Sequence, residues 1–287
     1  MSAGLRALAL TIALSAEPVR LSGAATAPQP ASGPSAEDRA GIEAVLDQYL
    51  RGFHTGDPEA VQSACLPELS KRGVAPAFWG FARQSLEELS WERLAIAGKV
   101  YVGDGRFDDT TPRRVRVLDV AGNIAAAELI GGDWMDFAHL VRFRDGWRIA
   151  DLAWWADVPR PEWAGSRDDV AAVRSVLEEY VAAVRAADVA AVERVTHPAF
   201  RMRSPEVRGD TEYLHPLGRR ETAFLEGVAG SARDARAGVF QVWSNDAWGM
   251  IAAGFIRAES WTGYVHLLRI EGEWRIVNAL WTGTPSR

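Results

Sequence analysis

One pattern occurs twice in this chain, and this repetition constrains its fold more than any other feature. Apolar residues recur at the spacing of one buried helix face, i, i+3, i+4, i+7, i+8 and i+11, in two segments. The two sets are Ile42, Val45, Leu46, Tyr49, Leu50 and Phe53, and Val173, Val176, Leu177, Tyr180, Val181 and Val184. Tyr180 follows Tyr49 by 131 residues. A repeat of this length indicates duplicated domains rather than a short-period solenoid.

The segments that follow the two helices also match. Second helices are predicted over residues 58–65 and 189–196, with Asp57 and Asp188 as N-caps. Alternating residues over 137–143 and 264–270, each followed by an acidic residue and a glycine, predict terminal hairpins. Further strands are expected over residues 115–120, 124–130, 239–243 and 248–256. Helices followed by antiparallel strands define an α+β unit.

The length and composition agree with two globular domains and exclude several kinds of site. We predict domains over residues 37–156 and 167–287, joined by the proline-containing segment 156–165. A net charge of −6 argues against nucleic-acid binding. The single cysteine, Cys65, excludes a disulfide framework and a multi-cysteine metal site. Because the familiar nucleotide, zinc and hydrolase motifs are absent, we predict no cofactor and no metal.

Residues 1–36 read as a signal-peptide-like segment and a flexible leader. An apolar run over residues 7–16 is too short to span a bilayer, and Ala25 and Ala27 have the small side chains of a cleavage site. We therefore expect an extracytoplasmic protein, periplasmic or secreted, with no membrane span. The alternative is a cytoplasmic protein with a disordered N-terminus.

The two halves resemble the nuclear transport factor 2-like superfamily. The sequence from Tyr264 to Asn278, together with the Tyr180 helix and the dipeptide His197-Pro198, is most similar to its SnoaL-like and lumazine-binding branch. This resemblance implies two cones of curved antiparallel sheet, each closed by its N-terminal helices. It also implies that the repeats pair through their sheets as an internal pseudo-dimer. It does not imply one function, because the fold carries isomerases, dehydratases, cyclases, hydrolases and non-catalytic members.

The resemblance to ketosteroid isomerases of this superfamily suggests candidate site residues. Their helix tyrosine aligns with Tyr49 and Tyr180, and their strand acid aligns with His139 and His266. A tyrosine and a histidine can donate to a carbonyl oxygen and exchange protons, so these four residues are the catalytic candidates. Trp154 and Trp281 align with an aromatic residue at the pocket mouth and are the ligand-binding candidates.

Two observations weigh against this site. The isomerase base would fall near Gly73 and Ser204, and no acid lies between Lys71 and Ala77, which argues against steroid isomerisation. The tyrosines lie on apolar helix faces and the histidines on apolar strand faces, so both sets are also explained as core residues with satisfied polar atoms.

Three classes of function therefore stay open. The first is an exported protein that binds a small aromatic or apolar ligand in one or both cones. The second is a cofactor-free acid–base enzyme, of isomerase, dehydratase, cyclase or hydrolase type, that uses a Tyr/His pair. The third is a non-catalytic protein-interaction module. Binding ranks above catalysis because the expected base is missing.

Export is testable on the native protein. We expect cleavage after about residue 27, so the mature chain should begin near Pro28. Intact mass spectrometry of material from the native host measures this directly. Soluble cytoplasmic protein that retains residues 1–27 would contradict the expectation.

Overall fold

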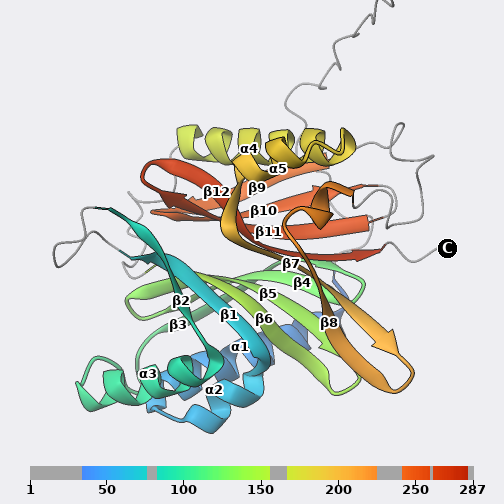
Figure 1. Ribbon diagram of the computed structural model, residues 1–287. Helices are drawn as coiled ribbons and strands as arrows, with labels where there is room; N and C mark the ends of the chain where they lie inside the picture. Colours follow the sequence, from blue (N-terminus) through green and yellow to red (C-terminus); the bar gives the residue numbers. More distant parts are fainter. Residues whose placement is uncertain (1–33, 76–82, 156–166, 225–240, 259–260, 284–287) are drawn as a thin grey trace, which may run out of the picture. The chain divides into compact units, whose positions relative to one another are not determined.

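A computed structural model describes residues 34–75, 83–155, 167–224, 241–258 and 261–283 (Figure 1). These residues belong to one compact unit that extends from Ser32 to Arg287. The expected leader up to residue 33 and the joining segment 156–165 lie outside the described residues, so the domain boundaries stay a prediction. No helix within the described ranges is long and apolar enough to cross a membrane.

The first repeat contains three helices and a six-stranded sheet. Its helices are α1 (Ala36–Thr55), α2 (Pro58–Ala64) and α3 (Trp91–Gly103). Its strands are β1 (Cys65–Ala75), β2 (Ser85–Leu89), β3 (Arg113–Ala121), β4 (Ile124–Gly131), β5 (Trp134–Phe143) and β6 (Gly146–Trp155). The strand order is β2-β1-β6-β5-β4-β3, antiparallel except for the parallel β1–β6 pair.

The second repeat has the same plan. It comprises α4 (Arg167–Arg185), α5 (Val189–Val195), β7 (Thr196–Arg208), β8 (Thr211–Leu217), the 3-10 helix η2 (Glu221–Phe224), β9 (Gln241–Trp248), β10 (Ile251–Arg257), β11 (Trp261–Ile270) and β12 (Glu273–Gly283). The order β8-β7-β12-β11-β10-β9 repeats that of the first sheet. The predicted tandem α+β architecture is therefore confirmed. The long strands β1 and β7, and their partners β2 and β8, were not predicted.

The helix starts follow from local capping. Ser35 accepts a hydrogen bond from the Asp38 amide at 3.0 Å and begins α1. Gly56 ends this helix at a φ of 67°, a left-handed conformation that favours glycine. Asp57 and Asp188 cap α2 and α5 through their carboxylates, as predicted.

Each repeat buries its own apolar core between helices and one sheet face. In Figure 1, α1, α2 and α3 lie over the first sheet, and α4 and α5 lie over the second. The first core includes Leu46, Tyr49 and Leu140, and the second includes Leu177, Tyr180 and Leu267. We call the helix-covered interior of each repeat its cone, the first cone and the second cone.

The opposite faces of the two sheets pack against each other. One buried cluster joins Met135, Phe137 and Ala153 of the first repeat to Ile251, Ala253, Leu268 and Val277 of the second. A second joins Ile124 and Ala126 to Phe255, Tyr264 and Leu280. Both faces of the central strands are thus buried, as their almost continuous burial indicates. We call this the inter-repeat face.

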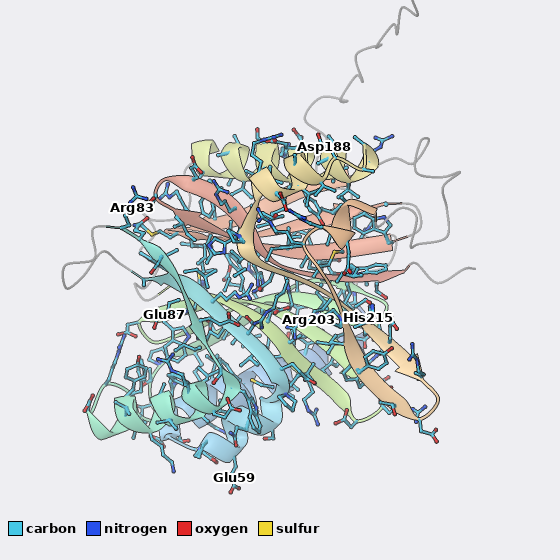
Figure 2. The ribbon with its side chains drawn as sticks, viewed as in Figure 1. Glu59, Arg83, Glu87, Asp188, Arg203 and His215 are labelled. Atoms are coloured by element: carbon cyan, nitrogen blue, oxygen red, sulfur yellow. The ribbon has the colours of Figure 1, made fainter. Side chains whose placement is uncertain are left out.

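Two buried arginines cross the inter-repeat face reciprocally. Arg72 on β1 donates to the Val277 carbonyl at 2.7 Å and to Asn278 Oδ1 at 2.9 Å. Arg203, labelled in Figure 2, donates from β7 to the Ala150 carbonyl at 2.7 Å and to the Asp151 carboxylate. The strand registers make these pairs equivalent: Arg72 lies opposite Ala153 on β6, and Arg203 lies opposite Leu280 on β12. The same type of arginine contact therefore joins the two repeats twice, once from each repeat.

His139 and His266 stack on each other between these arginines. Their ring centroids are 3.5 Å apart and the rings are inclined by 19°. His139 Nδ1 lies 3.5 Å from Asp151, and His266 Nδ1 lies 3.5 Å from the Asn278 amide. Burial lowers the pKa of both imidazoles, and repulsion from His139 further lowers the pKa of His266. The folded protein therefore favours two neutral rings.

This stacked pair predicts acid sensitivity. In the unfolded chain the histidines bind protons below a pKa of about 6.5, whereas the folded pair resists protonation. The free energy of unfolding should therefore fall as the pH drops below about 6.5 and be fully retained above it. Urea unfolding at several pH values, on wild type and on His139→Phe/His266→Phe, measures the effect.

The double variant should show a flatter dependence in that range. Any slope that remains belongs to groups such as His54 and His197, whose pKa values burial also lowers. Equal slopes in wild type and variant would contradict the account.

Candidate functional site

The first cone contains a buried cluster of polar side chains at its centre. Lys71 Nζ lies 2.8 Å from each carboxylate oxygen of Asp136 and donates to the Tyr49 hydroxyl at 3.0 Å. The Tyr49 hydroxyl donates to Asp136 Oδ2 at 3.4 Å, and Trp134 Nε1 donates to the same oxygen at 3.0 Å. We call Tyr49, Lys71 and Asp136 the lysine cluster. All three residues are at most 3% exposed.

Helix and strand periodicity bring the lysine cluster together. Tyr49 lies on the buried stripe of α1. Successive residues of a strand point to opposite faces, so Lys71 enters the first cone while its neighbour Arg72 crosses the inter-repeat face. On β5, Trp134 and Ala138 belong to the core of the first cone, and Asp136 lies between them on the same face.

Burial dominates the electrostatics of the lysine cluster. It lowers the pKa of Lys71, although the Asp136 carboxylate opposes this, and it raises the pKa of Asp136 against the effect of Lys71. Burial and the neighbouring carboxylate both raise the pKa of Tyr49 well above its usual value. Because the pKa values of Lys71 and Asp136 move toward each other, a proton passes between them at lower cost than in water.

Aromatic rings surround the Lys71 amine. Its Nζ lies 5.7 to 5.9 Å from the ring centroids of Tyr49, Phe53, Trp134 and Trp154. Trp154 lies against β1 because position 73 is a glycine. A Cβ there would lie 2.5 Å from Trp154 Nε1.

A surface groove of about 330 Å³ lies on the outer side of Trp154. Its walls come from α3, β2 and β6; Glu87 on β2 is labelled in Figure 2. The lining residues are Glu87, Leu89, Arg93, Ile96, Ala97, Val100, Tyr101 and Trp154. Ile96 and Val100 are 61% and 51% exposed, which is unusual for large apolar side chains. Trp154 lines the groove and also contacts the lysine cluster, so it connects the two.

In the described part of the second cone, the positions equivalent to Lys71 and Asp136 carry neither a lysine nor a carboxylate. The strand registers place Met202 where the first repeat has Lys71, and Gly263 where it has Asp136. Tyr180 occupies the place of Tyr49, and its hydroxyl lies 3.8 Å from Met202 Sδ. The Tyr180 hydroxyl also forms a side-chain hydrogen bond with the buried Thr222, so the described centre of the second cone has neutral polar groups in place of a lysine–aspartate pair.

The structure corrects the expected Tyr/His pairs. His139 and His266 do share a strand face with Phe137 and Leu268, but that face packs between the repeats rather than inside a cone. Tyr49 meets Lys71 and Asp136 instead of His139. Tyr180 meets Met202 instead of His266. The expected pairing is therefore wrong in both cones, since strand alternation cannot choose between two buried faces.

The two tryptophans lie on the cone faces of their sheets, as expected. Trp154 lines the groove at the first cone, and Trp281 packs against the core of the second. Whether either binds a ligand stays a prediction.

The sequence contained a signal for Lys71. Of the 32 Lys and Arg residues only two, Lys71 and Lys99, are lysines. A lysine can lose its proton and act as a nucleophile, whereas a guanidinium does not, so a rare lysine in an arginine-rich chain is a candidate functional residue. The signal for Asp136 was weaker, because its facing follows only from the correct choice of strand face.

Comparison with known proteins gives the family. The family described as “Putative lumazine-binding” matches residues 37–155 and 168–282. The chain belongs to this family, in two tandem copies. No curated protein matches the chain.

The described residues contain no group of three or more His, Cys, Asp or Glu side chains that could hold a metal.

Solved structures that resemble parts of this chain come from several bacteria. A nuclear transport factor 2-like protein of unknown function from Silicibacter pomeroyi is 18% identical, with a TM-score of 0.34, over 42% of this chain and 98% of its own. One from Shewanella baltica is 19% identical, with a TM-score of 0.33, over 43% and 97%. One with a cystatin-like fold from Novosphingobium aromaticivorans is 18% identical, with a TM-score of 0.32, over 47% and 88%.

The lysine cluster predicts a characteristic pattern of stabilities. Lys71→Met should cost about 3–5 kcal/mol, because it leaves Asp136 buried without its cation. Lys71→Met/Asp136→Asn should recover most of that loss, since a neutral pair needs no buried counter-charge and repeat two tolerates methionine there. Urea unfolding of the single and double variants measures both. A double variant no more stable than Lys71→Met would contradict this account.

Proposed function

We propose that the protein binds a flat aromatic small molecule in the groove at the first cone, and that the second cone is structural. The observation that carries this proposal is the difference between the cones. Among the described residues, the first cone combines an open apolar groove with a polar centre behind one shared aromatic wall, Trp154, whereas Met202 and Gly263 occupy the equivalent positions of the polar centre in the second. Binding sites of this kind are mostly apolar and contain a few placed polar groups.

The energetics of burial support a role beyond folding for the lysine cluster. A buried ion pair is seldom more stable than apolar residues of similar volume. The second repeat builds the same sheet and helices with Met202 and Gly263 at the equivalent places. The fold therefore does not need Lys71 and Asp136, and a ligand that uses them gives a reason for their presence.

The lining of the groove favours an aromatic ligand with hydrogen-bond acceptors. Trp154 and Tyr101 offer ring faces for stacking, and Ile96 and Val100 add apolar contact area. Acceptor oxygens would face the Lys71 amine and the Tyr49 hydroxyl once Trp154 turns aside. Lumazine, named in the family description, has a flat ring system with carbonyl oxygens and is the first compound to test.

Acid–base catalysis without a cofactor is the second candidate. It is favoured by the convergence of the pKa values of Lys71 and Asp136 beside the Tyr49 hydroxyl.

Export stays part of the proposal on the basis of residues 1–27 alone.

The groove can be tested by titration. Lumazine fluorescence should change saturably on binding to wild type. Trp154→Ala should weaken binding by about tenfold or more, since an aromatic stack contributes roughly 1–3 kcal/mol. Ile96→Asp should weaken it as well, and because Ile96 is exposed this variant should keep its stability.

Trp281→Ala is the matched control in the second cone, and it should keep the wild-type affinity. If Trp281→Ala loses binding and Trp154→Ala retains it, the ligand binds in the second cone, and the proposed site at the first cone is wrong. The absence of saturable binding by lumazine, and by 8-anilinonaphthalene-1-sulfonate as a general aromatic probe, would contradict the binding proposal.

A further inference from the structure

Lys71 is placed as a reactive amine rather than as a surface charge. The other fully buried cations in the described part of the chain, Arg72 and Arg203, are arginines that hold the inter-repeat face. A guanidinium keeps its proton under all ordinary conditions, whereas a buried lysine can lose it and become a nucleophile. Of the two strongly basic residue types, the first cone thus holds the one that can act as a nucleophile.

We propose that Lys71 captures an aromatic aldehyde or ketone as an imine inside the first cone. This inference rests on the ligand site proposed above and names its substrate class. It is carried by the contacts of the amine: an acid at 2.8 Å, a hydroxyl at 3.0 Å and four aromatic rings.

The lysine cluster has the arrangement of an activated nucleophile. Asp136 lies within hydrogen-bond distance of the amine. Trp134 Nε1 donates to Asp136 Oδ2 at 3.0 Å and so fixes the orientation of the carboxyl group. A nucleophile, an adjacent base and a third group that orients the base form the general pattern of covalent catalysis. The Tyr49 hydroxyl can donate to the carbonyl oxygen under attack.

The proposed step balances without an oxidant or reductant. Lys71 first passes a proton to Asp136, and the neutral amine attacks the carbonyl carbon to form a carbinolamine. One N–H proton moves to the carbonyl oxygen, which makes the carbinolamine neutral. Asp136 then returns its proton to the carbinolamine hydroxyl, which leaves as water while the nitrogen lone pair forms the C=N bond. The product is a protonated imine beside the Asp136 carboxylate. The surrounding rings exclude bulk water from the imine.

Trp154 is the route by which the carbonyl compound reaches the amine. One side of this residue lines the groove and its ring lies 5.8 Å from Lys71 Nζ. Its indole N–H has no hydrogen-bond partner among the described residues, so turning the ring breaks no hydrogen bond there. A flat aromatic carbonyl compound bound in the groove can stay stacked on the turned ring while its carbonyl group reaches the amine.

Reductive trapping tests the inference. The full chain is incubated with benzaldehyde and sodium cyanoborohydride near neutral pH, digested and mapped by mass spectrometry. The expected result is one benzyl group on Lys71, gained faster than on the exposed Lys99, because burial lowers the pKa of Lys71 and leaves more of its amine unprotonated beside the aromatic rings that bind the aldehyde. Because the chain has only two lysines, each site is resolved.

The controls separate this inference from the binding proposal. Lys99→Arg should keep the rapid adduct, whereas Lys71→Arg and Lys71→Met/Asp136→Asn should lose it. Each variant is also titrated with lumazine. Benzylation confined to Lys99 and the N-terminus, in wild type that still binds lumazine at the groove, would overturn the imine and leave the binding site intact. If wild type does not bind lumazine but still forms the Lys71 adduct, the binding proposal is overturned and the imine proposal stands.

Discussion

The reciprocal contacts of Arg72 and Arg203 across the inter-repeat face are the interaction on which the rest of the structure depends. Each guanidinium reaches a backbone carbonyl and a side chain on the last strand of the other repeat. Burying these two cations is tolerated only because the acceptors form hydrogen bonds with them and so offset the cost of removing them from water. Together with the apolar clusters they bury one face of each sheet, which leaves the helix-covered face of each repeat as a separate cone.

The two halves of this interface are not chemically equal. Arg203 meets a carboxylate, Asp151, whose pKa the guanidinium holds low although burial alone would raise it. Arg72 meets the neutral Asn278 at the equivalent position, and Glu88 supplies a charge at 3.4 Å. The cones differ in the same manner, since Met202 and Gly263 of the second repeat occupy the positions that Lys71 and Asp136 hold in the first. Duplication thus supplied two copies of one frame, of which the first carries the polar centre.

Much of the frame could be predicted from sequence, because helix stripes, capping residues and hairpin turns are local signals. The stripe through Tyr49 and Tyr180 and the caps at Asp57 and Asp188 are confirmed. The facing of His139 and His266 could not be predicted, because alternation groups residues by face but does not say which face lies inside when both are buried. Lys71 was missed for a related reason: its strand, β1, has no regular alternation in sequence.

Burial in the first cone makes the amine of Lys71 unlike that of an ordinary surface lysine. Nuclear magnetic resonance of protein labelled at lysine Nζ measures this most directly, because only Lys71 and Lys99 contribute signals. The account predicts that one lysine, absent from the spectrum of Lys71→Arg, titrates at a clearly lower pH than the ordinary lysine value of about 10.4. Two lysines that both titrate near that ordinary value would contradict it.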